Sequence, residues 1–484
     1  MRVYLQSLRR GWLVGLSMVL GACLVVCFAA PANAQSYTPP THITVEMYAF
    51  DPDSRVVFGL CTSSTDPAQR DNRPGCTAFP GNESLRYPFA TNPATVKIDG
   101  TAPEDRYLLD VVPQEMSPGT HLLPALQAQA IAARTYAFWH IRTDAVTPGA
   151  INNLEDYQVF IPRTADRLAS ADQQRLVDAA VLQNRYYLSY KESYTVSIYG
   201  QTLTLSDQDP IFAEFSADVR EQTVANPPFP YLQSVADPVS SHPQVPSLDG
   251  HGHGLSQNGA GRWARGSESY RCDPHPAPCE PPPNPPLQAW SVRWQEAFQI
   301  LTHYYTGINV RDANAGNKLI TPAHRWLPLQ VRWDTPDQRP PAVMNPGERR
   351  AVTFWIQNAG KESWPTNANV HFSCETFAGL QSAQTSAIFC LEQVRPSAPV
   401  PPGGAFSATL TLEIPTHTSD CIVGPFFDLY KDGARFAELG YQEVQESWPS
   451  YFVNIRVAGN CYVTFAPLVQ APIAVLSANE IPAH

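Results

Sequence analysis

The segment from Val111 to His140 constrains the fold of this chain more than any other stretch. It joins a stretch with helix-breaking residues to a long alanine-rich run. From Pro124 onward alanine dominates, a proline stands where the first turn of a helix tolerates a missing N–H, and no glycine interrupts the run. Small or apolar residues recur at helical spacing, at Leu126, Ala130, Ala133 and Ala137. We therefore predict a buried helix whose small side chains let other backbone approach closely.

The residues ahead of this helix predict a loop. Pro113, Pro118 and Gly119 break regular structure, and Glu115 falls between them. A carboxyl at a helix entry has an ordinary structural role, since the positive end of the helix dipole favours its charge. A carboxyl enclosed between an apolar helix and a loop also has a chemical use, because loss of solvation keeps its proton in place near neutral pH.

Two separated blocks carry a resemblance to a known family. The strings P-Q-E-M at 113–116 and A-L-Q-A-Q-A-I-A-A-R-T-Y-A at 125–137 resemble the signature of the stage II sporulation protein D family, also called the SpoIID/LytB or amidase-enhancer domain. A second block, G-H-G-H-G-L-S-Q-N-G-A at 250–260, resembles that family's G-H-G-V-G-M-S-Q-x-G-A. With looser likenesses on either side, the resemblance covers residues 42–310.

The resemblance implies an α+β catalytic-type domain at residues 41–310 and a set of site residues. Glu115 stands where relatives that cut the glycan strands of peptidoglycan carry their catalytic acid. His251, Ser256 and Gln257 stand on the wall of the family's glycan cleft. In lytic cleavage the C6 hydroxyl of the sugar closes onto the anomeric carbon, so one carboxyl can act first as acid and then as base. A partner carboxylate, which ordinary hydrolysis requires, is not needed.

Arg134 lies in the middle of the predicted apolar helix. A buried charge there requires a partner. We expect Arg134 either to brace the loop that bears Glu115 or to contact a substrate hydroxyl, and we count it among the substrate-binding candidates.

Two segments carry possible metal ligands. His251 and His253 form an H-x-H that would need His242 or Asp249 to complete a zinc site, and a glycine-rich loop holds such ligands poorly. In some relatives a zinc site is formed by Cys and His residues, but residues 153–156 fill that region here with Asn, Leu, Glu and Asp. The prediction is therefore no metal and no cofactor.

The N-terminus predicts export. Arg2, Arg9 and Arg10 precede an apolar run, and Ala32-Asn33-Ala34 fits a small-x-small cleavage site, so residues 1–34 are predicted to be a signal peptide. Two alternatives stay open, a lipid anchor on Cys23 and an uncleaved anchor. The net charge of −11 argues against a general affinity for nucleic acid.

The cysteines beyond this segment are even in number and fall in local pairs. In an exported protein this predicts disulfides. Proximity suggests the pairs Cys61–Cys76, Cys272–Cys279, Cys374–Cys390 and Cys421–Cys461.

From Leu327 the chain changes to short alternating runs with turns between them, which is typical of an all-β sandwich. The pieces P-G-E at 346–348, W-I-Q-N-A-G at 355–360 and S-W-P at 363–365 resemble the immunoglobulin-like central domain of the neighbour-of-BRCA-one protein. We therefore predict an immunoglobulin-like sandwich at residues 327–457 and a C-terminal tail at 458–484.

Two functions follow from the resemblance. The first is an extracytoplasmic lytic transglycosylase that cuts the bond between N-acetylmuramic acid and N-acetylglucosamine, with peptidoglycan glycan strands as its partner. The second is a non-catalytic amidase enhancer or glycan-binding module that docks on a cell-wall amidase. The first is the leading hypothesis and the second is its alternative, and the domain by itself does not imply sporulation.

Overall fold

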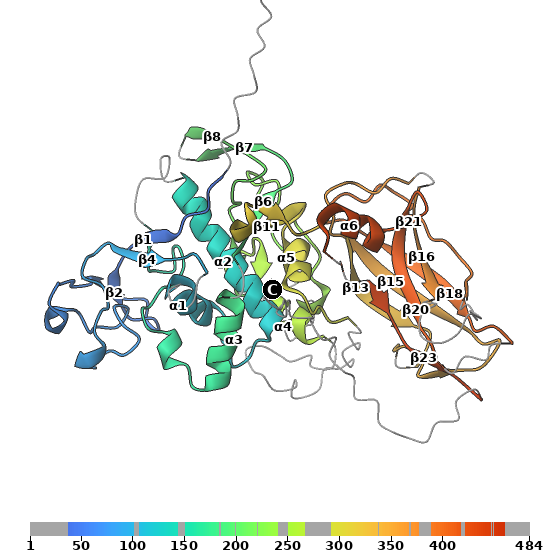
Figure 1. Cartoon of the computed structure of the whole chain (residues 1–484), viewed down its shortest axis with the longest axis horizontal. Coiled ribbons are helices and arrows are strands. Elements are labelled where there is room, and N and C mark those ends of the chain that lie inside the picture. Colours follow the sequence, from blue (N-terminus) through green and yellow to red (C-terminus); the bar gives the residue numbers. More distant parts are fainter. Residues whose placement is uncertain are drawn as a thin grey trace, which may run out of the picture. The chain divides into compact units, whose positions relative to one another are not determined.

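The computed structural model describes residues 37–100, 106–143, 151–182, 185–198, 200–219, 221–240, 250–266, 292–336, 338–366, 369–376, 389–417, 422–446, 448 and 450–459. The predicted signal peptide and nearly all of the predicted tail lie outside these ranges, as do the predicted pairs Cys272–Cys279 and Cys421–Cys461. The described residues from Pro39 onward belong to one compact unit. Its described part is a mixed α/β structure with many strands in small sheets (Figure 1).

The helices of the described chain are α1 (Arg106–Glu115), α2 (Leu123–Thr143), α3 (Ala171–Val181), α4 (Gln257–Arg265), α5 (Ala297–Tyr304) and α6 (Phe436–Val444). Single 3₁₀ turns occur at Pro67–Gln69, Glu83–Leu85, Ala165–Arg167, Pro238–Ser240 and Ala313–Ala315. Within the described ranges, no helix combines the length and the apolarity that crossing a bilayer requires.

The first half of the described chain holds two three-stranded sheets and three strand pairs. The three-stranded sheets have the orders β4-β1-β5 and β12-β11-β6. The pairs are β2 with β3, β7 with β8, and β9 with β10, of which only the last is parallel. The strands are β1 (His42–Glu46), β2 (Tyr48–Phe50), β3 (Val57–Leu60), β4 (Ala94–Lys97), β5 (Ile151–Asn152), β6 (Tyr186–Tyr190), β7 (Tyr194–Ile198), β8 (Gln201–Leu205), β9 (Phe215–Ser216), β10 (Leu255–Ser256), β11 (Ile308–Asp312) and β12 (Lys318–Leu319).

Helix α2 is the element on which the others pack. It contacts α1, α3, α4, α5 and β6, and Figure 1 shows it running through the middle of this helical group. Its alanines, among them Ala130, Ala133 and Ala137, are fully buried. Small side chains leave room for neighbouring elements on several faces, so the predicted alanine-packed helix is confirmed.

The predicted loop around Glu115 is wrong. Helix α1 runs through Pro113 and ends at Glu115 itself. Burial of Tyr107, Leu108, Val111 and Val112 stabilises this helix, while a proline close to its C-terminal end removes a single backbone hydrogen bond. Glu115 therefore lies at the negative end of a helix dipole, and not at the positive end that the helix-entry interpretation assumed.

The second half of the described chain consists mainly of two four-stranded sheets and a smaller three-stranded one. One large sheet has the order β13-β15-β18-β17, and the other joins β16, β20, β21 and β22. Phe354 of β15 lies 4.9 Å from Phe372 of β16 and 4.7 Å from Phe427 of β20, measured between ring centroids, so aromatic side chains fill the space between the two sheets. The immunoglobulin-like assignment of this part remains a prediction.

The alternating runs predicted at 331–333, 351–356, 370–372 and 408–412 all lie within strands, whereas the run at 452–455 spans the end of one strand and the start of another. The seven-residue strand β20 was not predicted. The strands are β13 (Trp326–Trp333), β14 (Val343–Met344), β15 (Arg349–Asn358), β16 (Val370–Thr376), β17 (Phe389–Cys390), β18 (Ala405–Glu413), β19 (Ile422–Val423), β20 (Pro425–Lys431), β21 (Ala434–Arg435), β22 (Tyr451–Phe452) and β23 (Ile455–Val457).

Two of the predicted disulfides are present, one in each half. Cys61 pairs with Cys76 across 15 residues, and Cys374 pairs with Cys390 across 16 residues. Sequence proximity was a sufficient guide for both because each bridge closes a short local loop.

Replacing both cysteines of one bridge by alanine is expected to lower the free energy of unfolding by about 3 kcal/mol, because a closed loop of this length limits the entropy of the unfolded chain. Denaturant unfolding of Cys61→Ala/Cys76→Ala measures the loss. The double variant of Cys374 and Cys390 is the matched comparison, and it should lose a similar amount. Wild-type unfolding midpoints for both double variants would contradict this expectation.

Candidate active site

Glu115 is held by two donors that come from distant parts of the chain. Its Oε1 accepts the backbone N–H of Val159 at 3.1 Å, and its Oε2 accepts Nε2 of Gln257 at 3.1 Å. Gln257 is the first residue of α4 and lies 142 positions further along the sequence. The fold thus brings together one predicted site residue from each of the two sequence blocks.

The environment of Glu115 favours its neutral form. The side chain keeps some exposed surface, but the surrounding protein solvates a charge poorly. Burial raises the pKa of Glu115, and the nearby charge of Glu155 adds to this, while the hydrogen bonds from Gln257 and Val159 oppose it. A carboxyl with a raised pKa and an accessible edge can give a proton to a bound molecule.

Ser256 is placed differently from the expectation that it lines a cleft wall. Its side chain is fully buried, and its Oγ accepts the N–H of Gly259 at 3.0 Å, which caps the N-terminus of α4. It also belongs to β10, which pairs with β9. Ser256 therefore fixes the start of α4, and through it the position of Gln257.

Arg134 is also placed differently. It is fully buried, and its guanidinium donates to the carbonyl oxygens of Val181 at 3.0 Å and of Tyr186 at 3.1 Å. These oxygens belong to the end of α3 and the start of β6. Arg134 braces these two elements against α2.

Tyr136 is a site residue that the sequence reasoning did not single out, although it lies within the quoted motif. Its ring stacks on Phe212 at 5.3 Å and contacts His140 at 4.5 Å between centroids. Burial raises the pKa of Tyr136, and the charges of Glu214 and Glu115 raise it further. The phenol thus lies near both carboxylates. Its helical spacing of four from His140 was the available signal.

The glycine turn at 250–254 places two imidazoles beside a third group. His251 and His253 stack with centroids 5.0 Å apart, and their ring nitrogens lie within 4.8 Å of each other and of a carboxylate oxygen of Glu214. Burial lowers the pKa of His251. Gly250, Gly252 and Gly254 all have positive φ, and a Cβ at Gly254 would fall 2.0 Å from the carbonyl oxygen of Glu214. Only glycine allows this approach.

The turn that follows β9 carries a buried carboxylate, Asp218. Asp218 accepts two hydrogen bonds from Arg262 of α4, at 3.1 and 3.0 Å, and both side chains are 2% exposed. This ion pair fastens the turn after β9 to the helix that carries Gln257.

Residues 153–156 stand where some relatives carry the cysteines and histidines of a zinc site, and Asn153 has a structural role here. Asn153 instead bonds both backbone groups of Tyr48, accepting its N–H at 2.7 Å and donating to its carbonyl oxygen at 3.0 Å. Among the described residues, potential metal ligands gather at Glu214, His251 and His253 and at Cys61, Asp71 and Cys76. The second group contains a disulfide and so offers no thiolate.

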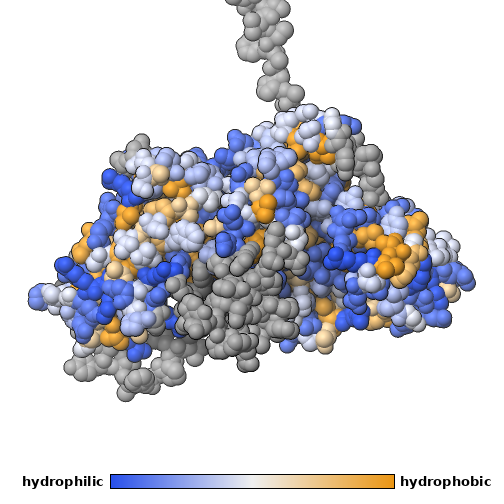
Figure 2. All heavy atoms as spheres, turned by 180° about the vertical axis from the view of Figure 1, so that it is seen from behind, coloured by the Kyte–Doolittle hydropathy of each residue, from blue (hydrophilic) through white to orange (hydrophobic). Residues whose placement is uncertain are grey.

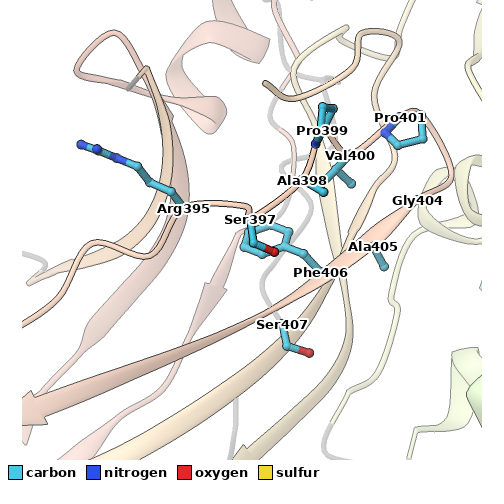
Figure 3. Close-up of a pocket in the computed structure, with 10 residues that line it drawn as sticks. All are labelled: Arg395, Ser397, Ala398, Pro399, Val400, Pro401, Gly404, Ala405, Phe406 and Ser407. Atoms are coloured by element: carbon cyan, nitrogen blue, oxygen red, sulfur yellow. The ribbon is translucent and has the colours of Figure 1, made fainter. Parts of the chain in front are cut away.

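A hollow of about 480 Å³ lies elsewhere, in the β-rich half (Figure 3). Its wall is the 395–401 segment and the start of β18, with Phe406 and Arg395 among the labelled side chains. Arg395 is the one charged side chain that lines it. Because no acid, base or nucleophile pair gathers there, this hollow carries no chemistry comparable to that around Glu115.

The described fold and site define a mixed α/β protein with a partly enclosed carboxylic acid on one helix and an amide donor at the start of another. Comparison with known families agrees with the resemblance drawn from the motifs. Residues 95–188 match the model of the family described as Stage II sporulation protein, SpoIID. This match contains α1, α2 and Glu115, and it supports a cell-wall-related function.

One curated relative is similar to part of this chain, and its description names no activity. An uncharacterized protein of Brachyspira hyodysenteriae (strain ATCC 49526 / WA1) is 34% identical over 98 residues, which cover 20% of this chain and 24% of that protein. The match therefore spans about a quarter of the relative's length.

Proposed function

We propose that this protein is an exported peptidoglycan lytic transglycosylase in which Glu115 is the acid and base. The substrate is the glycan strand, cut between N-acetylmuramic acid and N-acetylglucosamine. The single observation that carries the proposal is the Glu115 carboxyl, whose pKa is raised by burial and whose two oxygens are held by Val159 and Gln257. The SpoIID match over residues 95–188 supports the cell-wall setting.

The reaction balances with this one carboxyl. Glu115 gives its proton to the glycosidic oxygen as the bond from that oxygen to the anomeric carbon breaks. The C6 hydroxyl oxygen of the same muramic acid then bonds to the anomeric carbon, and its proton passes to the Glu115 carboxylate. The products are a free hydroxyl on one sugar and a 1,6-anhydro-muramic end on the other, and the enzyme regains its starting form.

The neighbouring groups suit a sugar chain. A contiguous aromatic group lies near Glu115 and Glu214. It consists of Tyr136, Phe212 and Phe215, and the ring centroid of Tyr136 lies 5.3 Å from that of Phe212 and 6.2 Å from that of Phe215. Aromatic faces with a few polar groups are typical of sites that bind small organic ligands. His251 and Gln257 supply the polar contacts proposed for the strand.

Export is part of the proposal. The N-terminal segment 1–34 reads as a signal peptide, and the two disulfides fit an oxidising compartment. The β-rich half, proposed as an immunoglobulin-like sandwich, would act there as a second, non-catalytic module.

The test is a product analysis. Purified protein is incubated with glycan strands stripped of stem peptides, and the products are examined by mass spectrometry for 1,6-anhydro-muramic ends. Such ends support the transglycosylase. Reducing ends in their place would mean hydrolysis, and an intact strand would overturn the enzymatic proposal.

The pH dependence of kcat/KM gives a separate check. Because the acid form of Glu115 is the active one, kcat/KM should fall as the pH rises through a pKa above the ordinary glutamate value of 4.5. Gln257→Leu removes a hydrogen bond that lowers this pKa, so the fall should move to higher pH in that variant. A fall at the ordinary glutamate value, or a shift to lower pH in the variant, would contradict this assignment.

The second candidate, an amidase enhancer without its own activity, is favoured by one observation. Val56, Val57, Phe58 and Leu60, on and beside β3, are between 47% and 51% exposed. Figure 2 shows hydrophobic surface on the side of the molecule that carries β2 and β3. An exposed apolar strip is a common docking surface. If glycan strands stay intact, a Phe58→Ser variant that no longer stimulates a cell-wall amidase would support this candidate.

A further inference from the structure

We propose that the β-rich half carries a second glycan-binding site, made by the hollow of about 480 Å³ beside β18 and by the indole of Trp355 on the neighbouring strand β15. Its ligand is an N-acetylated glycan that carries carboxylates, namely the muramic acid strand of the proposed function, on which this inference rests. The residues that line the hollow include no carboxylic acid, so the site binds the strand without cutting it.

The alternation along β15 places Trp355 on the outer face of its sheet. Its two neighbours in the chain, Phe354 and Ile356, are fully buried on the inner face, whereas Trp355 keeps part of its surface exposed. Two other tryptophans of this half, Trp333 and Trp364, are only 2% and 4% exposed and belong to the core. Trp355 therefore offers an aromatic ring to a ligand from the solvent side.

The neighbours of Trp355 across the sheet are polar. Gln330 of β13 pairs with it on one side and Ser407 of β18 on the other, so all three side chains stand on the same face, with paired Cβ atoms about 4.5–5.5 Å apart. On the next outward rung, the hydroxyls of Thr353 and Thr409 bond each other at 2.9 Å. A protein-docking surface typically surrounds such a ring with apolar side chains. Amide and hydroxyl groups around an aromatic ring suit the hydroxyls and the apolar face of a sugar.

The hollow continues this outer face at the edge of β18. Ser407 belongs to both, and it lines the hollow together with Ala405, Phe406 and Ser397. Figure 3 shows Ser407 and Ala405 on one side of β18 and the ring of Phe406 on the other. The volume lies within the range of about 300–1,000 Å³ that is typical of ligand sites. A sugar that stacks on Trp355 thus leaves space in the hollow for the next sugar of the strand.

The charge of the hollow favours an anionic ligand. Arg395 is the one charged side chain that lines it, although the whole chain has a net charge of −11. Arg395 is exposed and extends outward from the rim in Figure 3, where it can reach a carboxylate of a bound strand. N-acetylmuramic acid carries such a carboxylate on its lactyl group, and N-acetylglucosamine carries none. The site should therefore prefer a strand that contains muramic acid.

The test is a sedimentation assay in which the full chain binds insoluble glycan strands stripped of stem peptides. The parent protein and every variant carry Glu115→Gln, so that the strands stay intact during the measurement. Trp355→Thr should weaken binding by about tenfold, because it removes the stacking surface. Tyr441→Ala removes an aromatic ring of the same half that is 52% exposed, and it should bind as the parent does. Equal binding by these two variants, or no binding by the parent, would overturn the proposal.

A second variant covers the case in which Trp355→Thr proves unfolded by circular dichroism. Ser407→Glu alters an exposed side chain, so it should fold normally. It places a negative charge between the indole and the hollow and should weaken binding of the muramic acid strand. Parent-like binding by Ser407→Glu would then contradict the proposal.

The nature of the ligand is tested with chitin, a polymer of N-acetylglucosamine without carboxylates. The parent protein should bind chitin more weakly than the muramic acid strand, and Arg395→Gln should reduce this difference. Equal binding of the two polymers by the parent would contradict the assigned ligand.

The result is separate from that for the proposed transglycosylase. Binding that depends on Trp355, with no 1,6-anhydro ends formed by the protein that retains Glu115, would overturn the enzyme and leave this site in place. Anhydro ends together with parent-like binding by Trp355→Thr would do the reverse.

Discussion

Glu115→Gln is expected to reduce the rate of glycan cleavage by about 10²–10⁴-fold, the usual contribution of a general acid and base. The amide keeps the size of the side chain and can still accept the N–H of Val159. It cannot give a proton to the glycosidic oxygen or receive one from the C6 hydroxyl. The loss should therefore appear mainly in kcat, with KM little changed.

The matched control is Glu155→Gln. Glu155 is a nearby carboxylate, but it is 46% exposed and pairs with Arg55 at 3.0 Å. Its replacement makes the same carboxyl-to-amide change close to Glu115 while leaving the proposed acid in place. Cleavage close to the wild-type rate in this variant, together with loss in Glu115→Gln, assigns the proton transfer to Glu115. Equal cleavage by both variants would show that another group is the acid.

Asp218→Ala is expected to lower the free energy of unfolding strongly. Asp218 and Arg262 form a two-bonded ion pair from which water is excluded. Removing the carboxylate takes away the acceptor of two hydrogen bonds from a buried guanidinium, and breaking a buried pair in this way typically costs about 3–5 kcal/mol of unfolding free energy. Urea unfolding followed by circular dichroism measures the loss.

The exposed pair Arg175–Asp172 gives the comparison, because its side chains are 72% and 79% exposed. Asp172→Ala should cost less than about 1 kcal/mol, since water and salt screen surface pairs. In addition, Asp218→Leu combined with Arg262→Met should recover much of the stability, because it removes both buried charges together. An Asp218→Ala variant no less stable than Asp172→Ala would show that the pair contributes little.

Predictions that depended on local chemistry agree with the structure. The alanine-rich helix, both described disulfides and the alternating strands of the β-rich half follow from spacing within short windows. The prediction for Glu115 shows the limit of that reasoning. Pro113 suggested a loop, but burial of the apolar face of α1 outweighs the one hydrogen bond that a proline near the helix end removes.

The sequence by itself determined the organising helix, the acid candidate and the family resemblance, because these reside in contiguous residues whose spacing repeats with the period of a helix or a motif. Only the tertiary structure decided which side chains meet. It joined Gln257 to Glu115, gave Ser256 and Arg134 bracing roles, and placed Glu214 beside His251 and His253. The physical reason is that such contacts depend on how α4 and β9 pack around α2, and local preferences carry little information about partners that lie far away in the sequence.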